Sequence, residues 1–159
     1  MITGSTAANF YAVPRMTRDI DIVVALSERD IGKFIRRFER DHYLEPETLR
    51  EAVKNKGMFN LIHDQYIIKV DFVVRKDTPY RRREFSRKKK ISVDGQDLYV
   101  VAPEDLILSK LVWAKDSQSE VQLRDVQNLL QSVKGLDQRY LSRWAKQLGV
   151  DSLYRQASR

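Results

Sequence analysis

The sequence predicts an α+β fold of two layers, in which helices flank a mixed sheet of about five strands and further helices form the C-terminal end. Three observations support this prediction. Apolar or alternating runs at 19–26, 58–62 and 66–74 are typical of strands, and a hairpin pattern follows at 90–101. Apolar residues then recur at helical spacing through most of the chain after Pro103.

The length and composition fit one folded unit. The chain has 159 residues, of which 42% are hydrophobic, and this is enough for one compact core. We predict a core region at 1–101 and a C-terminal helical segment at 102–159 that packs on it. No apolar run approaches the ~20 residues that cross a bilayer, and no secretory signal pattern opens the chain. We therefore expect a cytoplasmic protein with no membrane association.

Charge and metal-binding residues narrow the classes of function. Lysine and arginine number 29 against 22 aspartate and glutamate, and the resulting net charge of +7 favours polyanionic partners. Cysteine is absent, which excludes disulfides, thiolate nucleophiles and cysteine-ligated zinc. His42 and His63 stand in unlike settings and cannot supply a usual zinc site. Any bound metal must be held mainly by carboxylates.

The chain opens with a turn and a short helix. Gly4 and Ser5 precede a helix expected over 6–12, which ends before Pro14 because a proline ring disfavours helical geometry at the preceding residue. The segment 19–26 alternates and then becomes continuously apolar, as in a strand buried on both faces. Its polar start should lie at an edge of the sheet.

Two helices and two strands should follow. Ser27 resembles a helix N-cap, and apolar residues at helical spacing extend this helix to about His42. A second helix should run over 47–56. The segments 58–62 and 66–74 are rich in strand-forming residues and flank a short turn, so they should pair in antiparallel fashion.

The second half should hold a hairpin and then helices. The stretch 75–90 is strongly basic and is expected to be a connection between strands. Asp94 and Gly95 between the apolar segments of 90–101 predict a hairpin. Pro103 opens a helix, and two further helical patterns follow it.

Three aspartates are the candidate functional residues. Side chains alternate along a strand, so Asp19 and Asp21 project from one face about 7 Å apart. If the strand of Asp71 pairs beside them, roughly 4.8 Å away, Asp71 completes a triad on that face. Like charges held together cost stability unless a cation lies between them, and oxygen ligands suit Mg²⁺ or Mn²⁺. The triad therefore predicts a metal site, and two ions in the active complex would serve phosphoryl chemistry.

A simpler explanation of these aspartates stays open. The pattern Asp-x-Asp at a strand start is common, and such residues are often solvated edge positions that discourage aggregation. Gly4 and Ser5 add weight to the functional interpretation. A glycine turn before a helix lets backbone N–H groups and the positive end of the helix dipole receive a triphosphate oxygen.

Taken together, these motifs resemble a known superfamily. Gly4-Ser5, a spacer that ends in Arg15-Met16-Thr17-Arg18, the run Asp19-Ile20-Asp21-Ile22-Val23-Val24 and the later Val70-Asp71-Phe72 are similar to the polymerase-beta-type nucleotidyltransferases. Residues 2–130 most resemble the minimal and abortive-infection-type enzymes of prokaryotic toxin–antitoxin systems. Such proteins usually carry a helix and a strand before the Gly-Ser turn, whereas only Met1-Ile2-Thr3 stand there here, so we expect a short first strand.

The resemblance implies a magnesium-dependent transfer of a nucleotide from a nucleoside triphosphate to an acceptor. It gives Asp19 and Asp21 the role of shared metal ligands. It makes Asp71 the third carboxylate, which assists deprotonation of the acceptor hydroxyl. The nucleotide-binding residues that it implies are Gly4, Ser5, Arg15, Thr17 and Lys110.

Lys110 and Arg15 also have a structural explanation. Apolar neighbours surround Lys110 on its helix, so its ammonium needs an anionic partner. That partner is either a triphosphate or Asp125 on the next helix. The role of Arg15 is open in the same way.

The basic stretch is a second candidate surface. We expect it to contact nucleic acid through Arg81, Arg82, Arg83, Arg87, Lys88 and Lys89. Tyr80 and Phe85 lie among these residues, a pattern suited to phosphate contacts and base stacking. The alternative is a solvated connection whose charges keep a strand edge soluble.

Three functions are therefore in competition. The leading one is an enzyme that transfers a nucleotide to an RNA, such as a tRNA end, or to a protein hydroxyl. The second is a catalytically inactive domain of the same fold that binds nucleic acid. The third is a toxin–antitoxin component that binds an antitoxin or another protein partner, with the apolar face of the helix around Trp144 as the contact surface.

Overall fold

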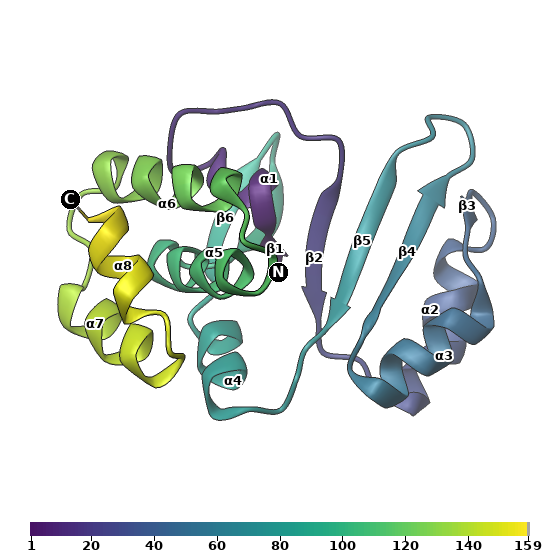
Figure 1. The fold of residues 1–159 in the computed structure, drawn as a ribbon. Helices are drawn as coiled ribbons and strands as arrows, with labels where there is room; N and C mark the ends of the chain where they lie inside the picture. Colours follow the sequence, from purple (N-terminus) through teal and green to yellow (C-terminus); the bar gives the residue numbers. More distant parts are fainter. Residues whose placement is uncertain (159) are drawn as a thin grey trace.

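A computed structural model describes residues 1–158 and contains one mixed sheet of seven strands (Figure 1). The strand order across the sheet is β3-β4-β5-β2-β1-β7-β6. The strands are β1 Ile2–Thr3, β2 Ile20–Val24, β3 His42–Tyr43, β4 Met58–His63, β5 Lys69–Val74, β6 Lys89–Val93 and β7 Gln96–Val100. The pairs β2–β5 and β1–β7 are parallel, and the other neighbouring pairs are antiparallel.

Eight α-helices accompany this sheet within residues 1–158. They are α1 Gly4–Ala8, α2 Ile31–Phe38, α3 Pro46–Asn55, α4 Pro79–Ser86, α5 Pro103–Ser117, α6 Glu120–Ser132, α7 Gln138–Gln147 and α8 Asp151–Ala157. A 3-10 turn, Glu28–Asp30, precedes α2, and Ser27 and Asp30 close its capping box. None of the helices described is long and apolar enough to span a membrane.

The predicted α+β class and mixed sheet are confirmed, but the prediction of about five strands is wrong. Two of the seven strands, β1 and β3, have only two residues each, which is too short to produce an alternating pattern. The short first strand expected from the resemblance is β1. The predicted strand 66–74 begins later, at Lys69, because Ile67 has a positive φ of 52° and belongs to the turn.

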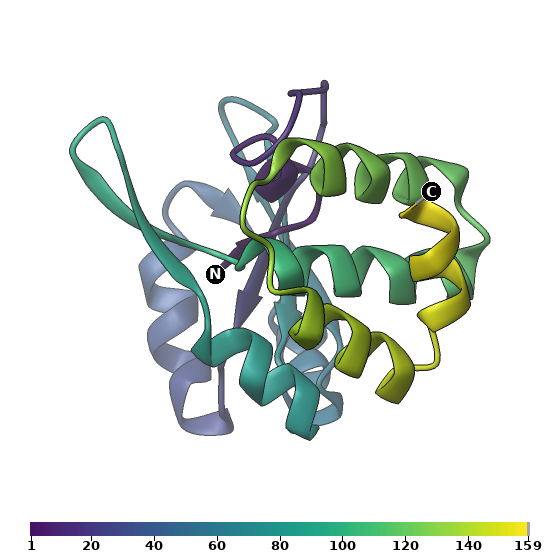
Figure 2. The same ribbon diagram turned by 90° about the vertical axis from the view of Figure 1, so that its left-hand side faces the viewer.

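Other expected boundaries shift for local reasons. The first helix begins at Gly4 and ends at Ala8, not at Ala12. The basic stretch does connect two strands, but it contains helix α4, which starts at Pro79 after the side chain of Thr78 accepts a hydrogen bond from the backbone of Arg81. The hairpin at Asp94-Gly95 is confirmed, and β6 and β7 project from the body of the molecule (Figure 2).

Apolar side chains form two clusters on either side of β2. One cluster joins α1 and β7 to the C-terminal helices α5–α8, and it contains Leu106, Leu111 and Leu141. The other joins α2 and α3 to β4 and β5, and it contains Leu49 and Phe72. Figure 1 shows the corresponding helices at opposite ends of the sheet.

The two faces of β2 and β5 differ in what covers them. Ile22 and Val24 of β2 and Phe72 of β5 pack into the second cluster, beneath α2 and α3. Alternation therefore turns Asp21 and Asp71 to the opposite face. That face carries the candidate site.

Candidate active site

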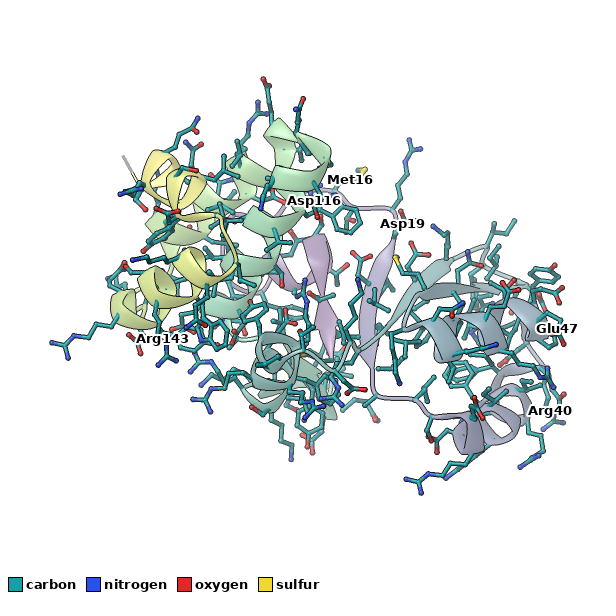
Figure 3. All side chains as sticks on the ribbon, turned by 60° about the horizontal axis from the view of Figure 1, so that its bottom comes forward. Met16, Asp19, Arg40, Glu47, Asp116 and Arg143 are labelled. Carbon is teal, nitrogen blue, oxygen red and sulfur yellow. The ribbon has the colours of Figure 1, made fainter. Side chains whose placement is uncertain are left out.

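The register of the sheet brings Asp21 and Asp71 together. Strands β2 and β5 run parallel, and Asp21 is the direct Cα partner of Asp71. Neighbouring strands lie about 4.8 Å apart, so the two side chains stand next to each other on one face. Asp19 lies just before the first residue of β2 (Figure 3). Asp21 and Asp71 thus form a pair near the start of two central strands, and Asp19 lies close enough for its charge to act on Asp21.

The turn at Gly4 packs against this group. Gly4 has a φ of 63°, in the left-handed region, and a Cβ at this position would lie 1.9 Å from Oδ2 of Asp21. Any side chain larger than hydrogen would displace the carboxylate. Glycine therefore sets the close approach of the α1 turn to β2.

The surroundings of Asp21 raise the pKa of its carboxyl. Burial raises the pKa of the Asp21 carboxyl, and the charges of Asp71 and Asp19 raise it further, against smaller opposing effects of Lys110 and Lys69. Nζ of Lys69 donates a hydrogen bond to Oδ2 of Asp71 at 2.8 Å. The site therefore concentrates negative charge that one lysine balances only in part.

The donor chemistry suits a hard cation, although the carboxylates are not assembled around one point. Oxygen ligands on a strand are what Mg²⁺ accepts. Within residues 1–158, no three histidine, cysteine, aspartate or glutamate side chains come close enough together to hold a metal ion. Asp71 instead binds Lys69. Asp19 and Asp21 are the residues best placed to hold a metal, and Asp71 would have to exchange its lysine for it.

A cationic group lies beside the glycine turn, centred on Asp125 of α6. Nζ of Lys110 donates to Oδ2 of Asp125 at 2.7 Å and to Oε1 of Gln122 at 3.0 Å. Arg15 donates to both carboxylate oxygens of Asp125 at 3.0 Å and to Oγ of Ser5 at 2.5 Å. Asp125 thus holds both cations, and Arg15 links the group to the start of α1 through Ser5.

Burial and neighbouring charges compete in setting the pKa values of Lys110 and Asp125, with different outcomes. Burial lowers the pKa of the Lys110 ammonium, which is 3% exposed, even though Asp125 favours its charged form. For the Asp125 carboxyl, burial acts to raise the pKa, but hydrogen bonds from Arg15 and Lys110 outweigh it and hold the pKa below its ordinary value. Two cations serve one carboxylate, and together they overcome the effect of burial on the Asp125 pKa.

Comparison with solved structures identifies the fold of this chain. No protein-family model matches the chain, and no curated protein matches its sequence. A crystal structure of an antigenic nucleotidyltransferase-like protein from Paracoccidioides brasiliensis superposes on it with a TM-score of 0.57. The two chains are 14% identical, and the match covers 99% of this chain and 82% of the other. The chain has a nucleotidyltransferase-like fold.

Within this nucleotidyltransferase-like fold, the two threonines near the site support the backbone. Oγ1 of Thr17 and Oγ1 of Thr6 each donate to the carbonyl of Asp19, at 3.3 and 3.2 Å. Thr17, which the resemblance placed among the nucleotide-binding residues, here fixes the entry into β2. Thr6 was not foreseen, because a threonine in a short helix carries no distinguishing pattern.

Two of the basic residues expected to contact nucleic acid have internal partners. Arg87 donates to Asp105 at 2.8 Å and to Glu104 at 2.9 Å, and its guanidinium lies 4.1 Å from the centre of the Tyr140 ring. Arg81 donates to both oxygens of Glu84, at 3.0 and 2.9 Å. The contacts of Arg87 hold the end of α4 on α5 and α7, whereas the Arg81–Glu84 pair lies within α4.

The expectation that Tyr80 stacks on bases is wrong. Its ring is 4% exposed and its hydroxyl donates to the carbonyl of Asp105, so it cannot stack on a base. Nζ of Lys88 lies 4.6 Å from the centre of the Phe85 ring. Arg82, Arg83 and Lys89 are exposed, and nucleic-acid contact by these three stays a prediction.

The apolar face expected to be free on the Trp144 helix is covered. Trp144 packs against the Tyr80 ring at a centroid distance of 5.1 Å, and its neighbours Leu141 and Ala145 are fully buried. The apolar face of this helix packs against the core. It therefore leaves little apolar surface for a partner protein.

Lys69 was the site residue that sequence reasoning left without a role. It stands two positions before Asp71 on the same strand, so alternation places both side chains on one face. That spacing was the available signal for their ion pair. Gln122 and Asp125 both accept a hydrogen bond from Lys110. Gln122 lies three positions before Asp125 on α6, a spacing that places the two side chains on one face but is a weaker indication of a shared partner.

Proposed function

We propose that the protein is a metal-dependent nucleotidyltransferase that moves a nucleotide from a nucleoside triphosphate to a hydroxyl of a tRNA-like RNA or of a protein. One observation carries this proposal: Asp21 and Asp71 face each other across parallel strands while the Gly4 turn closes on Asp21. The nucleotidyltransferase-like fold supports it. A solvated edge position would explain neither the close packing on Asp21 nor the raised pKa of its carboxyl.

The residues divide the chemistry between them. The acceptor oxygen would attack the α-phosphorus as the bond to pyrophosphate breaks, and the proton of the acceptor hydroxyl would pass to the carboxylate of Asp71. Asp19 and Asp21 would hold Mg²⁺ or Mn²⁺, in the active complex two ions, which supply positive charge to the triphosphate. Lys69 must release Asp71 before it can accept a proton.

The triphosphate would bind between the glycine turn and the cations on Asp125. The hydroxyl of Ser5, next to Gly4, and the guanidinium of Arg15 already meet there. The charges of both Asp125 and Asp21 favour the charged form of Lys110 and act to raise its pKa. Asp125 would then keep Arg15 and Lys110 in position before the substrate arrives.

A second candidate is an inactive protein of the same fold that binds nucleic acid or a protein partner. The ion pair between Lys69 and Asp71 favours it, because a lysine then takes the place of a metal. A role within a prokaryotic toxin–antitoxin system, in the cytoplasm and with an antitoxin as partner, belongs to either candidate. The covered Trp144 face makes that helix a poor antitoxin contact.

Thermal unfolding with added magnesium and nucleotides tests the proposal. A ligand that binds the native state raises its apparent stability, so Mg²⁺ together with one triphosphate should raise Tm. The rise should be lost in Asp21→Asn and Asp71→Asn and retained in Asp116→Asn, whose side chain is exposed. Labelled nucleotide should then appear on an RNA or protein acceptor. If no triphosphate raises Tm and no label is transferred, the enzyme proposal is overturned and the result favours the inactive candidate.

A further inference from the structure

Helix α2 carries a stripe of exposed basic side chains that the proposed function does not use. The α2 basic stripe consists of Arg29, Lys33, Arg36, Arg37 and Arg40, all exposed. Lys33, Arg36 and Arg37 lie in α2, whereas Arg29 lies in the preceding 3-10 turn and Arg40 follows the end of the helix. In a helical projection the three α2 positions fall within one arc of about 100° and span about 6 Å along the axis. Its members therefore form one surface.

None of the five has an acidic partner within residues 1–158, although acidic residues are near in sequence. Glu28, Asp30, Glu39 and Asp41 lie in the same segment, and none of them forms an ion pair with the stripe, because Asp30 is bound to Ser27 and Asp41 to His42. Elsewhere in the chain, basic side chains such as Lys69 and Arg87 are paired with carboxylates. The stripe is thus a row of cations without ion-pair partners among the described residues, flanked by the four carboxylates of its own segment.

The ordinary explanation of a basic helix end covers only part of the stripe. Arg36 and Arg37 lie in the last turn of α2, where cations complement the negative end of the helix dipole. Arg29 and Lys33 lie at the opposite end, where the dipole disfavours a cation. Spacings of three and four residues also place like charges side by side along the stripe, which weakens a helix. Such an arrangement costs stability unless an anion binds it.

The other face of α2 identifies the kind of partner. Ile31, Phe34, Ile35 and Phe38 pack into the apolar cluster beneath α2 and α3. The helix therefore has no free apolar face to insert into a membrane. Four of the five stripe residues are arginines, whose planar guanidinium binds phosphate oxygens in bidentate fashion.

We propose that the α2 basic stripe binds the phosphate backbone of a nucleic acid. The stripe lies on the side of the sheet opposite the aspartates, because α2 covers the face formed by Ile22 and Phe72. Arg40 stands at the periphery of the molecule, well apart from Asp19 (Figure 3). The stripe is therefore a separate docking surface, and it binds whether or not the aspartate site transfers a nucleotide.

Fluorescence anisotropy with a labelled RNA hairpin, and in parallel with a DNA duplex, tests the inference. One variant replaces Lys33, Arg36, Arg37 and Arg40 by Gln. The control variant replaces Arg124, Lys134, Arg139 and Lys146, exposed residues of the C-terminal helical region, by Gln. Both lose four positive charges, so a difference between them reports position and not net charge.

The stripe variant should bind at least about tenfold more weakly at ~0.1 M salt, and the slope of log K against log salt should fall by about two to four. The control variant should change affinity by less than about threefold. The RNA and DNA arms identify which nucleic acid the stripe accepts. Equal losses in both variants, or no binding by the unmodified protein to either probe, would overturn the inference. Because magnesium and triphosphate stabilisation is measured separately, failure here leaves the proposed enzyme activity standing.

Discussion

Gly4 determines how closely the α1 turn approaches the carboxylate of Asp21. It combines a left-handed φ of 63° with a position where a Cβ would lie 1.9 Å from Oδ2 of Asp21. Gly95 has a similar φ of 77° but nothing within 4 Å of its would-be Cβ. Substitution at Gly4 would add both backbone strain and a steric clash, whereas substitution at Gly95 would add the strain alone. A comparison of the two positions therefore separates these effects.

We expect Gly4→Ala to destabilise the protein more than Gly95→Ala does. The control change carries only the left-handed strain, about 1–2 kcal/mol. The change at Gly4 carries the same strain and must also displace the Asp21 carboxylate, so it should cost about 1–2 kcal/mol more. Urea unfolding of both variants measures the difference. Equal losses would mean that the turn yields without disturbing Asp21.

Asp125 stabilises two cations, one of them buried. Its side chain is 6% exposed, and Lys110 is 3% exposed. Asp125→Asn should lower the free energy of unfolding at pH 7 by about 3 kcal/mol, because it leaves the Lys110 ammonium buried without a charged partner. Adding Lys110→Met should recover part of that loss, since it removes the unpaired charge.

The same pair predicts a dependence on pH. The pKa of the folded Asp125 carboxyl lies below the ordinary value of 3.8, so its contribution is complete above that value and is lost as pH falls through the folded pKa. The stability gap between the unmodified protein and Asp125→Asn should therefore be constant near neutrality and narrow below about pH 4. Thermal unfolding from pH 3 to 7 measures it. A gap that persists unchanged at the acid end would show that Asp125 acts through packing and not through charge.

At the scale of elements, local sequence signals were reliable where one pattern acted alone. The Asp94-Gly95 hairpin and the helix from Pro103 follow directly from turn and capping chemistry. The clustering of Asp21 and Asp71 could be expected only on the assumption that their strands pair, which tertiary structure decides. Short elements such as β3 have too few residues for periodicity, and they exist because longer neighbours present a free edge.

Helix α4 shows why the basic stretch could not be understood from its charges. Its sequence is rich in arginine, as a solvated connection would be, but two of these arginines meet carboxylates that come from α4 itself and from α5. Glu84 is 2% exposed and Asp105 is fully buried. The sequence does not reveal which of several arginines faces inward, because that depends on how the helix packs against its neighbours.

Arg87→Ala should therefore destabilise the protein much more than Arg83→Ala. Removing Arg87 leaves Asp105 buried without its cation, a loss of about 3–5 kcal/mol, although the hydroxyl of Tyr140 still donates to Asp105. Arg83 is exposed, and its loss should stay within about 0.5 kcal/mol. Chemical unfolding of the two variants provides the comparison. Similar small effects for both would place Arg87 in a solvated surface pair.

At the scale of the whole molecule, the two apolar clusters raise the question of how the parts unfold. One cluster lies with α2 and α3, and the other lies with the C-terminal helices, and the candidate site lies on the strands between them. Strands β2, β1 and β7 join the two ends through continuous pairing. The sequence predicts that 1–101 and 102–159 behave as one compact unit.

A matched pair of core truncations tests that prediction. Leu49 in the α2–α3 cluster and Leu111 in the C-terminal cluster are both fully buried, so Leu49→Ala and Leu111→Ala should each cost about 2–5 kcal/mol. If the sheet couples the clusters, each variant should show one unfolding transition, shifted to lower denaturant as a whole, with helical signal and tryptophan fluorescence changing together. Trp113 and Trp144 both lie in the C-terminal helices, so the fluorescence reports on that end of the molecule. For Leu49→Ala, a helical signal that falls before the fluorescence changes would show that the two clusters unfold independently. The candidate site would then lie on a boundary between two units and not within one.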